Sequence, residues 1–205
     1  MRYTNLVLGM LPLLAAVAFS GAARAQMLSG AALVNALKGG GYVLVIRHAN
    51  APAQPPAKDA ADPENVKLER QLDAAGRDSA RAMGEAVKAL HLPLGDTYAS
   101  PTYRALQTVK LAGLGSAKTM PELDEGAAGM ASNADAARVK WLKAKAAEPP
   151  RAGTDTVIVT HAPNITGTFG VDAAAGETLV LKPDGKGGAT QVARIKIQDW
   201  PGLAR

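Results

Sequence analysis

One stretch of the chain, Tyr42–Asn50, constrains the fold more than any other. It begins with an apolar, mostly β-branched run, Tyr42–Ile46, that follows three consecutive glycines. Such a run is typical of a strand buried on both faces, and strands of this kind belong to parallel sheets covered by helices. Arg47 and His48 stand at its carboxyl end, the edge at which open α/β sheets bind ligands. The stretch therefore predicts an α/β fold with a cation and an imidazole at the ligand-binding edge.

A second strand of the same type ends in the same way. Residues Thr156–Thr160 are mostly β-branched, and His161 follows them directly. A single histidine at the end of a strand is ordinary, but two at the same topological position, one preceded by Arg47, indicate a functional site. The third histidine, His91, ends a predicted helix, where a cation near the helix C-terminus is the ordinary explanation.

The remaining periodicity and turn residues predict one domain, residues 26–205, with three α/β/α layers around a mostly parallel central sheet. Ser100 and Pro101 are expected to begin a helix as N-cap and first residue, and Gly84 indicates close packing of another helix on the sheet. The expected helices are 29–38, 73–90, 102–111, 132–147 and one beginning at Pro163, and the expected further strands are 96–99, 118–123, 177–182 and 190–197.

The first 25 residues have the composition of an export signal. Arg2 is followed by an apolar core from Leu6 to Phe19 and by small residues at Ala23 and Ala25. The apolar core is shorter than the roughly 20 residues of a membrane span, so a cleaved signal is favoured over an uncleaved anchor. We therefore expect residues 1–25 to be a signal peptide, the mature protein to be periplasmic or secreted, and no stable membrane anchor after cleavage.

Composition excludes several classes of function. The leader carries two arginines and no acidic residue, so the net charge of +5 falls to +3 after cleavage. That excess, without a basic run, does not predict nucleic-acid binding, but it is compatible with an anionic small molecule. The chain has no cysteine, no His-Glu-x-x-His, no P-loop and no nucleophile elbow. No metal site and no cofactor are therefore expected.

Arg104 lies in the first turn of the helix expected at 102–111. The helix dipole disfavours a cation there by about 0.3–1 kcal/mol, so this arginine suggests that an anion binds at the same helix end. A solvated surface arginine is the alternative. Thr108 shares the face of Arg104 and is expected to support the site or the packing.

Together these segments resemble the histidine phosphatase superfamily, also called phosphoglycerate mutase-like, in its compact branch 1 form. The resemblance is carried by Arg47-His48-Ala49, by Arg70–Arg77, by Tyr98–Thr108 with its serine-proline-x-x-arginine-alanine-x-x-threonine pattern, and by Val157–Ala162. The four blocks follow the order of the family. The longer insertion of the mutases is missing, so the resemblance implies a phosphatase and not a mutase.

The resemblance implies a two-step covalent mechanism. A neutral His48 would attack the phosphorus of a monoester, and water would then hydrolyse the phosphohistidine. Arg47, Arg104 and a protonated His161 would bind the phosphate oxygens and stabilise charge as it develops. Two guanidinium groups suit this task because each can bind two oxygens at once. The expected partner is a phosphorylated small molecule.

The leaving oxygen needs a general acid, and three carboxyls are candidates. Relatives carry a Leu-x-Glu after the strand that corresponds to 118–123, which selects Glu125, but Glu122 and Asp124 stay open as alternatives. His161 is followed by Ala162, so the His-Asp pair of the phytase branch is missing.

Substrate specificity is expected to depend on two loops. Residues 50–68 and 126–133 are expected to form the pocket for the carbon side of the substrate. Within them, the loop 51–62 is a candidate lid or specificity wall, and 126–133 is a candidate second wall. Export would place cytoplasmic phosphohistidine proteins out of reach and would favour a sugar phosphate or an envelope phosphate. The alternative function is a non-catalytic binder of phosphorylated ligands, which would need neither Glu125 nor a reactive His48.

Overall fold

The computed structural model describes residues 27–126 and 132–205, and of residues 132–135 only the backbone. The predicted leader lies outside the described residues, as does most of the candidate wall 126–133. The helices are α1 (Gly30–Lys38), α2 (Ala74–Ala89), α3 (Tyr103–Leu111), α4 (Ser132–Ala147), α5 (Ala162–Phe169) and α6 (Trp200–Leu203). The strands are β1 (Val43–Arg47), β2 (Leu94–Ala99), β3 (Ala117–Thr119), β4 (Asp155–Thr160), β5 (Thr178–Pro183) and β6 (Ala189–Ile195).

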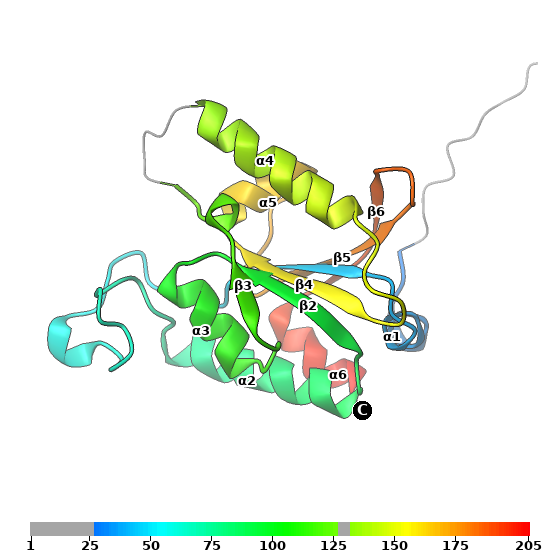
Figure 1. The fold of residues 1–205 in the computed structure, drawn as a ribbon. Coiled ribbons are helices and arrows are strands. Elements are labelled where there is room, and N and C mark those ends of the chain that lie inside the picture. Colours follow the sequence, from blue (N-terminus) through cyan, green and yellow to red (C-terminus); the bar gives the residue numbers. More distant parts are fainter. Residues whose placement is uncertain (1–26, 127–131) are drawn as a thin grey trace, which may run out of the picture.

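The six strands form one sheet in the order β3-β2-β4-β1-β5-β6 (Figure 1). β1, β2, β3 and β4 are parallel, whereas β5 runs antiparallel to both β1 and β6. β5 is therefore the single strand of this sheet that points the other way. The predicted mostly parallel sheet is confirmed, and the two histidine strands β1 and β4 are direct neighbours in it.

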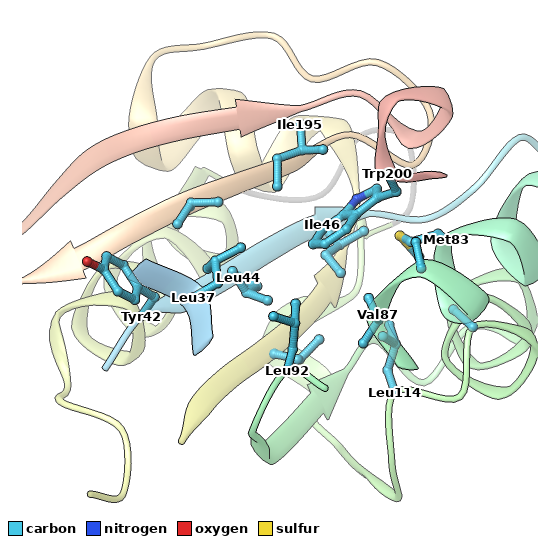
Figure 2. Packing of buried hydrophobic residues seen from close by; sticks show 14 of the residues in the cluster. Leu37, Tyr42, Leu44, Ile46, Met83, Val87, Leu92, Leu114, Ile195 and Trp200 are labelled. Carbon is cyan, nitrogen blue, oxygen red and sulfur yellow. The ribbon is translucent and has the colours of Figure 1, made fainter. Parts of the chain in front are cut away.

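Helices cover both faces of the sheet, because the central strand is apolar on both. Leu44 and Ile46 of β1 belong to one core together with residues of α1, α2, α3 and α6. Val43 and Val45 belong to a second core, on the opposite face, together with residues of α4 and α5. Figure 2 shows the first core, in which Ile46 lies between the sheet and Met83 of α2. The three-layer α/β/α prediction is confirmed.

Two details at the ends of elements differ from the sequence prediction. Ser100 and Pro101 do not begin the helix; α3 begins at Tyr103, with Thr102 as its N-cap residue. The predicted strand 118–123 ends at Thr119, since Pro121 starts a short 3₁₀ turn, η2 (Pro121–Leu123). Pro163 does lie in the first turn of α5, and the strands predicted at 177–182 and 190–197 are found as the antiparallel pair β5 and β6.

Gly84 of α2 packs against another helix end and not against the sheet. A Cβ atom at this position would lie 2.5 Å from the carbonyl oxygen of Ala112, directly after α3. The glycine therefore lets α2 approach the backbone at the C-terminal end of α3.

Candidate active site

The site lies where β1 and β4 end side by side. Arg47 and Thr160 are paired in the parallel register, and the His48 amide donates to the carbonyl of Thr160 over 3.0 Å. His48 and His161 therefore leave the sheet at the same level. Their ring centroids are 5.2 Å apart with an interplanar angle of 64°. The two predicted histidines are thus brought together by strand register alone.

His48 is buried, with 3% of its surface exposed, and its hydrogen bonds define its tautomer. Arg104 Nε lies 3.3 Å from His48 Nε2, and an arginine can only donate, so Nε2 is the acceptor. His48 Nδ1 then carries the hydrogen and donates to the carbonyl of Ala49 over 2.8 Å. Burial lowers the pKa of His48 to about 4, and the charges of Arg104, Arg47 and Arg70 act in the same direction, against the Ala49 bond. The ring is therefore neutral at physiological pH, as a nucleophile must be.

The backbone around His48 is held by α3 and α2. The Ala49 amide donates to Thr108 Oγ1 over 3.0 Å, and that hydroxyl donates to the carbonyl of Arg104 over 2.8 Å. Thr108 thus supports the site, as its position on the helix predicted. Asn50 donates to Asp73 Oδ2, and Asp73 Oδ1 caps the start of α2 by accepting from the Gly76 amide.

Arg104 contacts both histidines and Glu125. Its Nη2 contacts Glu125 Oε1 in an ion pair and lies 3.2 Å from His161 Nδ1. The sequence suggested that an anionic ligand binds at the N-terminal end of α3 and compensates for the positive charge of Arg104 in its first turn. The structure places the Glu69 carboxylate at the helix end itself, where its Oε2 accepts from the Tyr103 amide over 2.8 Å.

His161 is fully buried. Its Nδ1 accepts from Arg104, so its Nε2 carries the hydrogen and donates to Ser100 Oγ over 2.9 Å. Burial, followed by the charge of Arg104, lowers the pKa of His161 to about 2. Without a bound anion His161 is therefore neutral, because desolvation and nearby guanidinium groups oppose a second positive charge. The protonated His161 expected in the presence of a bound phosphate stays a prediction.

Of the three candidate acids, the structure brings Glu125 into the site. Besides its ion pair with Arg104, the Glu125 carboxylate lies 3.5 Å from Arg70 Nη1 and 3.5 Å from His161 Nδ1. About a third of its side chain (32%) is exposed, so it is accessible to a leaving group. Within the described part of the chain, neither Glu122 nor Asp124 has a side-chain hydrogen bond or ion pair with these groups.

The charge of Arg47 acts on both histidines and contributes to the lowering of both pKa values. Arg47 Nη1 donates to the carbonyl of Ala173 over 2.8 Å. Its Nε is buried and has no hydrogen-bond partner in the described structure. A buried charged donor without an acceptor is costly, and a phosphate oxygen is the kind of group that would satisfy it.

Arg70 is a site residue that the sequence analysis did not single out. Besides its contact with Glu125, it donates from Nε to the carbonyl of Pro52 over 2.7 Å and from Nη2 to that of Ala51. It thus ties the start of the candidate lid, 51–62, to the site, while Gln71 ties the far end by donating to the carbonyl of Ala60. In the sequence, Arg70 could have been found as the first residue of the segment Arg70–Arg77, which is one of the four segments that resemble the family.

The described residues contain no group of three or more His, Asp or Glu side chains placed to hold a metal ion. None of the helices in the described ranges is long and apolar enough to cross a bilayer.

Comparison with known proteins identifies the family. A sequence model of the histidine phosphatase superfamily, branch 1, matches residues 43–160. The chain belongs to this superfamily. The predicted family and the predicted class of enzyme, a phosphatase hydrolase, are thereby confirmed. No curated protein matches the chain.

Solved structures share the fold at low sequence identity. The protein histidine phosphatase SixA, complexed with tungstate, is 20% identical, with a TM-score of 0.57 over 77% of this chain and 98% of that one. A phosphoserine phosphatase mutant from Entamoeba histolytica, in complex with phosphoserine, is 14% identical, with a TM-score of 0.51 over 77% and 98%. A further structure from that organism, a phosphoserine phosphatase with 3-phosphoglyceric acid, is 14% identical, with a TM-score of 0.53 over 76% and 96%. At such identities the similarity shows the fold alone.

Proposed function

We propose that this protein is an exported phosphatase that hydrolyses phosphomonoesters without a metal ion, through a phosphohistidine at His48. The observation that carries the proposal is the tautomer of His48. Its Nδ1–H is engaged by the Ala49 carbonyl, so the lone pair is on Nε2, which accepts from Arg104 Nε and becomes the attacking atom once a phosphate takes up that donor. A neutral imidazole oriented in this way is an activated nucleophile.

In the first step, His48 Nε2 forms a bond to phosphorus while the bond from phosphorus to the ester oxygen breaks. The leaving oxygen takes a proton from the protonated Glu125 carboxyl and departs as an alcohol. General acid catalysis of this kind contributes about 10²–10⁴-fold. The position of Glu125 within 3.5 Å of His161 supports this assignment, and it favours an enzyme over a non-catalytic binder.

In the second step, water attacks the phosphorus, and the bond to His48 Nε2 breaks. The Glu125 carboxylate accepts a proton of the water, which restores the acid for the next cycle. Inorganic phosphate leaves, and His48 returns to its neutral form.

The guanidinium groups of Arg47, Arg70 and Arg104 supply the positive charge that a phosphate dianion requires. Because opposite charges raise the pKa of an imidazole, bound phosphate would favour a protonated His161 that donates from Nδ1. His161 would then become protonated only when the substrate is bound.

The substrate class follows from export. The structural relatives include a protein histidine phosphatase and a phosphoserine phosphatase, but cytoplasmic phosphoproteins do not reach an exported enzyme. We therefore place the substrate among sugar phosphates or envelope phosphates. The mass of the protein from its native host tests export, because the chain should begin at Gln26; a chain that retains residues 1–25 would contradict cleavage.

The mechanism is tested by hydrolysis of p-nitrophenyl phosphate in the presence of a chelator. We expect turnover by the purified protein, loss of turnover in His48→Ala, and a phosphoenzyme that is labile in acid. His91→Asn is the matched control, because His91 is exposed and asparagine tolerates its backbone φ of 54°. Turnover that disappears with the chelator would refute metal independence. A folded wild-type protein without turnover would favour the binder.

A further inference from the structure

We propose that Asn164 is a positioning residue for the general acid. Its buried side-chain amide holds the segment that leads into Glu125 against the end of the strand that carries His161. The inference rests on the proposed function, because Asn164 acts through the acid that this function requires.

The contacts of Asn164 are made by one nitrogen. The residue lies in the first turn of α5 and is 5% exposed. Its Nδ2 lies 2.9 Å from the carbonyl oxygen of Leu123, 3.0 Å from that of Asp124 and 2.8 Å from Thr160 Oγ1. Thr160 Oγ1 in turn donates to the carbonyl of Leu123 over 2.8 Å. Two successive carbonyls directly before Glu125 are therefore fixed to the end of β4.

The chemistry of an amide suits this role. The residues that follow η2 form no strand or helix up to Gly126, so their carbonyl oxygens need hydrogen-bond donors from outside regular secondary structure. An asparagine NH₂ group offers two hydrogens to neighbouring acceptors. An aspartate at the same place would offer none, and its charge would face two carbonyl oxygens.

The catalytic need for this anchor arises from the change in charge of Glu125. As a carboxylate, Glu125 is held by Arg104 and Arg70 through ion pairs. As the protonated acid it is neutral, and the attraction to both guanidinium groups is lost. The bonds of Asn164 to the backbone do not depend on that proton. They therefore keep the carboxyl in place in the form that donates to the leaving oxygen.

The test compares two substrates that differ in the basicity of the leaving group. Phenyl phosphate releases a strongly basic phenolate and needs the acid, whereas dinitrophenyl phosphate releases a weakly basic one. The measured quantity is kcat/KM, which reports the first step and not the hydrolysis of the phosphoenzyme. We expect Asn164→Ala to lower kcat/KM about 10-fold or more for phenyl phosphate and no more than about 2-fold for dinitrophenyl phosphate. Glu125→Gln should show the same selectivity more strongly.

The double variant Asn164→Ala with Glu125→Gln gives the sharper result. Once the acid is removed, the further substitution of Asn164 should lower kcat/KM for phenyl phosphate no more than it lowers kcat/KM for dinitrophenyl phosphate. Thr97→Val is the matched control, since the buried Thr97 hydroxyl also holds a loop carbonyl, that of Leu114, at a distance from the acid. It should lower stability without changing the ratio of the two substrates.

Two results would overturn the inference, provided that Glu125→Gln keeps its selectivity. One is an equal loss of kcat/KM on both substrates in Asn164→Ala, and the other is a double variant in which the effects of the two substitutions simply add. A Glu125→Gln variant without selectivity would show instead that the acid of the proposed function is wrong, and the inference would fall with it. If Asn164→Ala does not fold, Asn164→Leu fills the volume without donating, and the same outcomes apply.

Discussion

At the scale of single residues, positive charges outnumber negative ones in the site. Three guanidinium groups, of Arg47, Arg70 and Arg104, surround His48 and His161, with Glu125 as the single carboxylate in contact among the described side chains. Both imidazoles respond by staying neutral, since burial and three like charges oppose protonation. A neutral His48 is ready to attack phosphorus, and a neutral His161 is ready to become charged when a dianion arrives.

The protonation of His48 can be measured directly. We expect the ring carbons and nitrogens of His48, followed by NMR without phosphate, to show the neutral Nδ1–H tautomer down to about pH 5, because burial lowers its pKa to about 4. In urea the same ring should titrate near its ordinary value of about 6.5. A folded protein in which His48 titrates near that value, or in which Nε2 carries the hydrogen, would contradict the assigned tautomer.

At the scale of helices and strands, the contacts of α3 set the position of Arg104. α3 carries Arg104 in its first turn, and its other end abuts α2 at Gly84. The N-terminal end of α3 is held by Glu69 from the loop before α2, and the C-terminal end by the close approach of α2. The arginine is thus positioned by both ends of its helix.

Gly84→Ala separates helix propensity from packing. Alanine would stabilise an exposed helix interior by about 1 kcal/mol relative to glycine. Here the added Cβ would lie 2.5 Å from the Ala112 carbonyl oxygen, and overpacking of this kind costs about 1–3 kcal/mol. We expect a net loss of unfolding free energy in urea, and no such loss in Glu85→Ala on the exposed face of α2. A Gly84→Ala protein as stable as wild type would contradict this, because it would show that the end of α3 can move away from α2 without loss of unfolding free energy.

At the scale of the whole molecule, the two site histidines and Asp155 make stability depend on pH in opposite directions. The histidines at the carboxyl edge of the sheet have lowered pKa values, so the native state loses stability as pH falls below about 6.5 and the unfolded chain takes up protons. Asp155, at the start of β4, has the reverse effect. Burial raises its pKa to about 7, against the bond that its Oδ1 accepts from the Tyr42 amide. Its Oδ2 has no partner in the described structure.

Asp155→Asn isolates this second contribution. The unfolded chain releases the Asp155 proton near pH 3.8 and the native state near about 7, so the wild type loses unfolding free energy as pH rises between these values. Asparagine stays neutral at every pH. We expect the stability of the variant relative to wild type to improve by on the order of 2 kcal/mol between about pH 5 and about pH 8. The relative stability should be read from urea unfolding at both pH values, and a pH-independent difference would contradict the raised pKa.

Much of this architecture was predictable from local pattern. The apolar runs that end at Arg47 and at Thr160 predict two buried strands, and the period of α2 predicts a helix. Because parallel strands bring their carboxyl ends to one edge, the meeting of His48 and His161 followed from the same pattern. The export signal and its consequences stay predictions.

The sequence by itself determined the order and type of the elements and the identity of the two histidines and of Arg104, because side-chain period and strand polarity are local properties. The tertiary structure decided which of the three carboxyls enters the site, and it added Arg70 to the site. It also decided that Glu69, and not Ser100, accepts from the first amide of α3 and that His161 is neutral. These outcomes depend on burial and on distances between residues far apart in the chain. Desolvation and Coulomb energy sum over all such neighbours, and no short pattern encodes that sum.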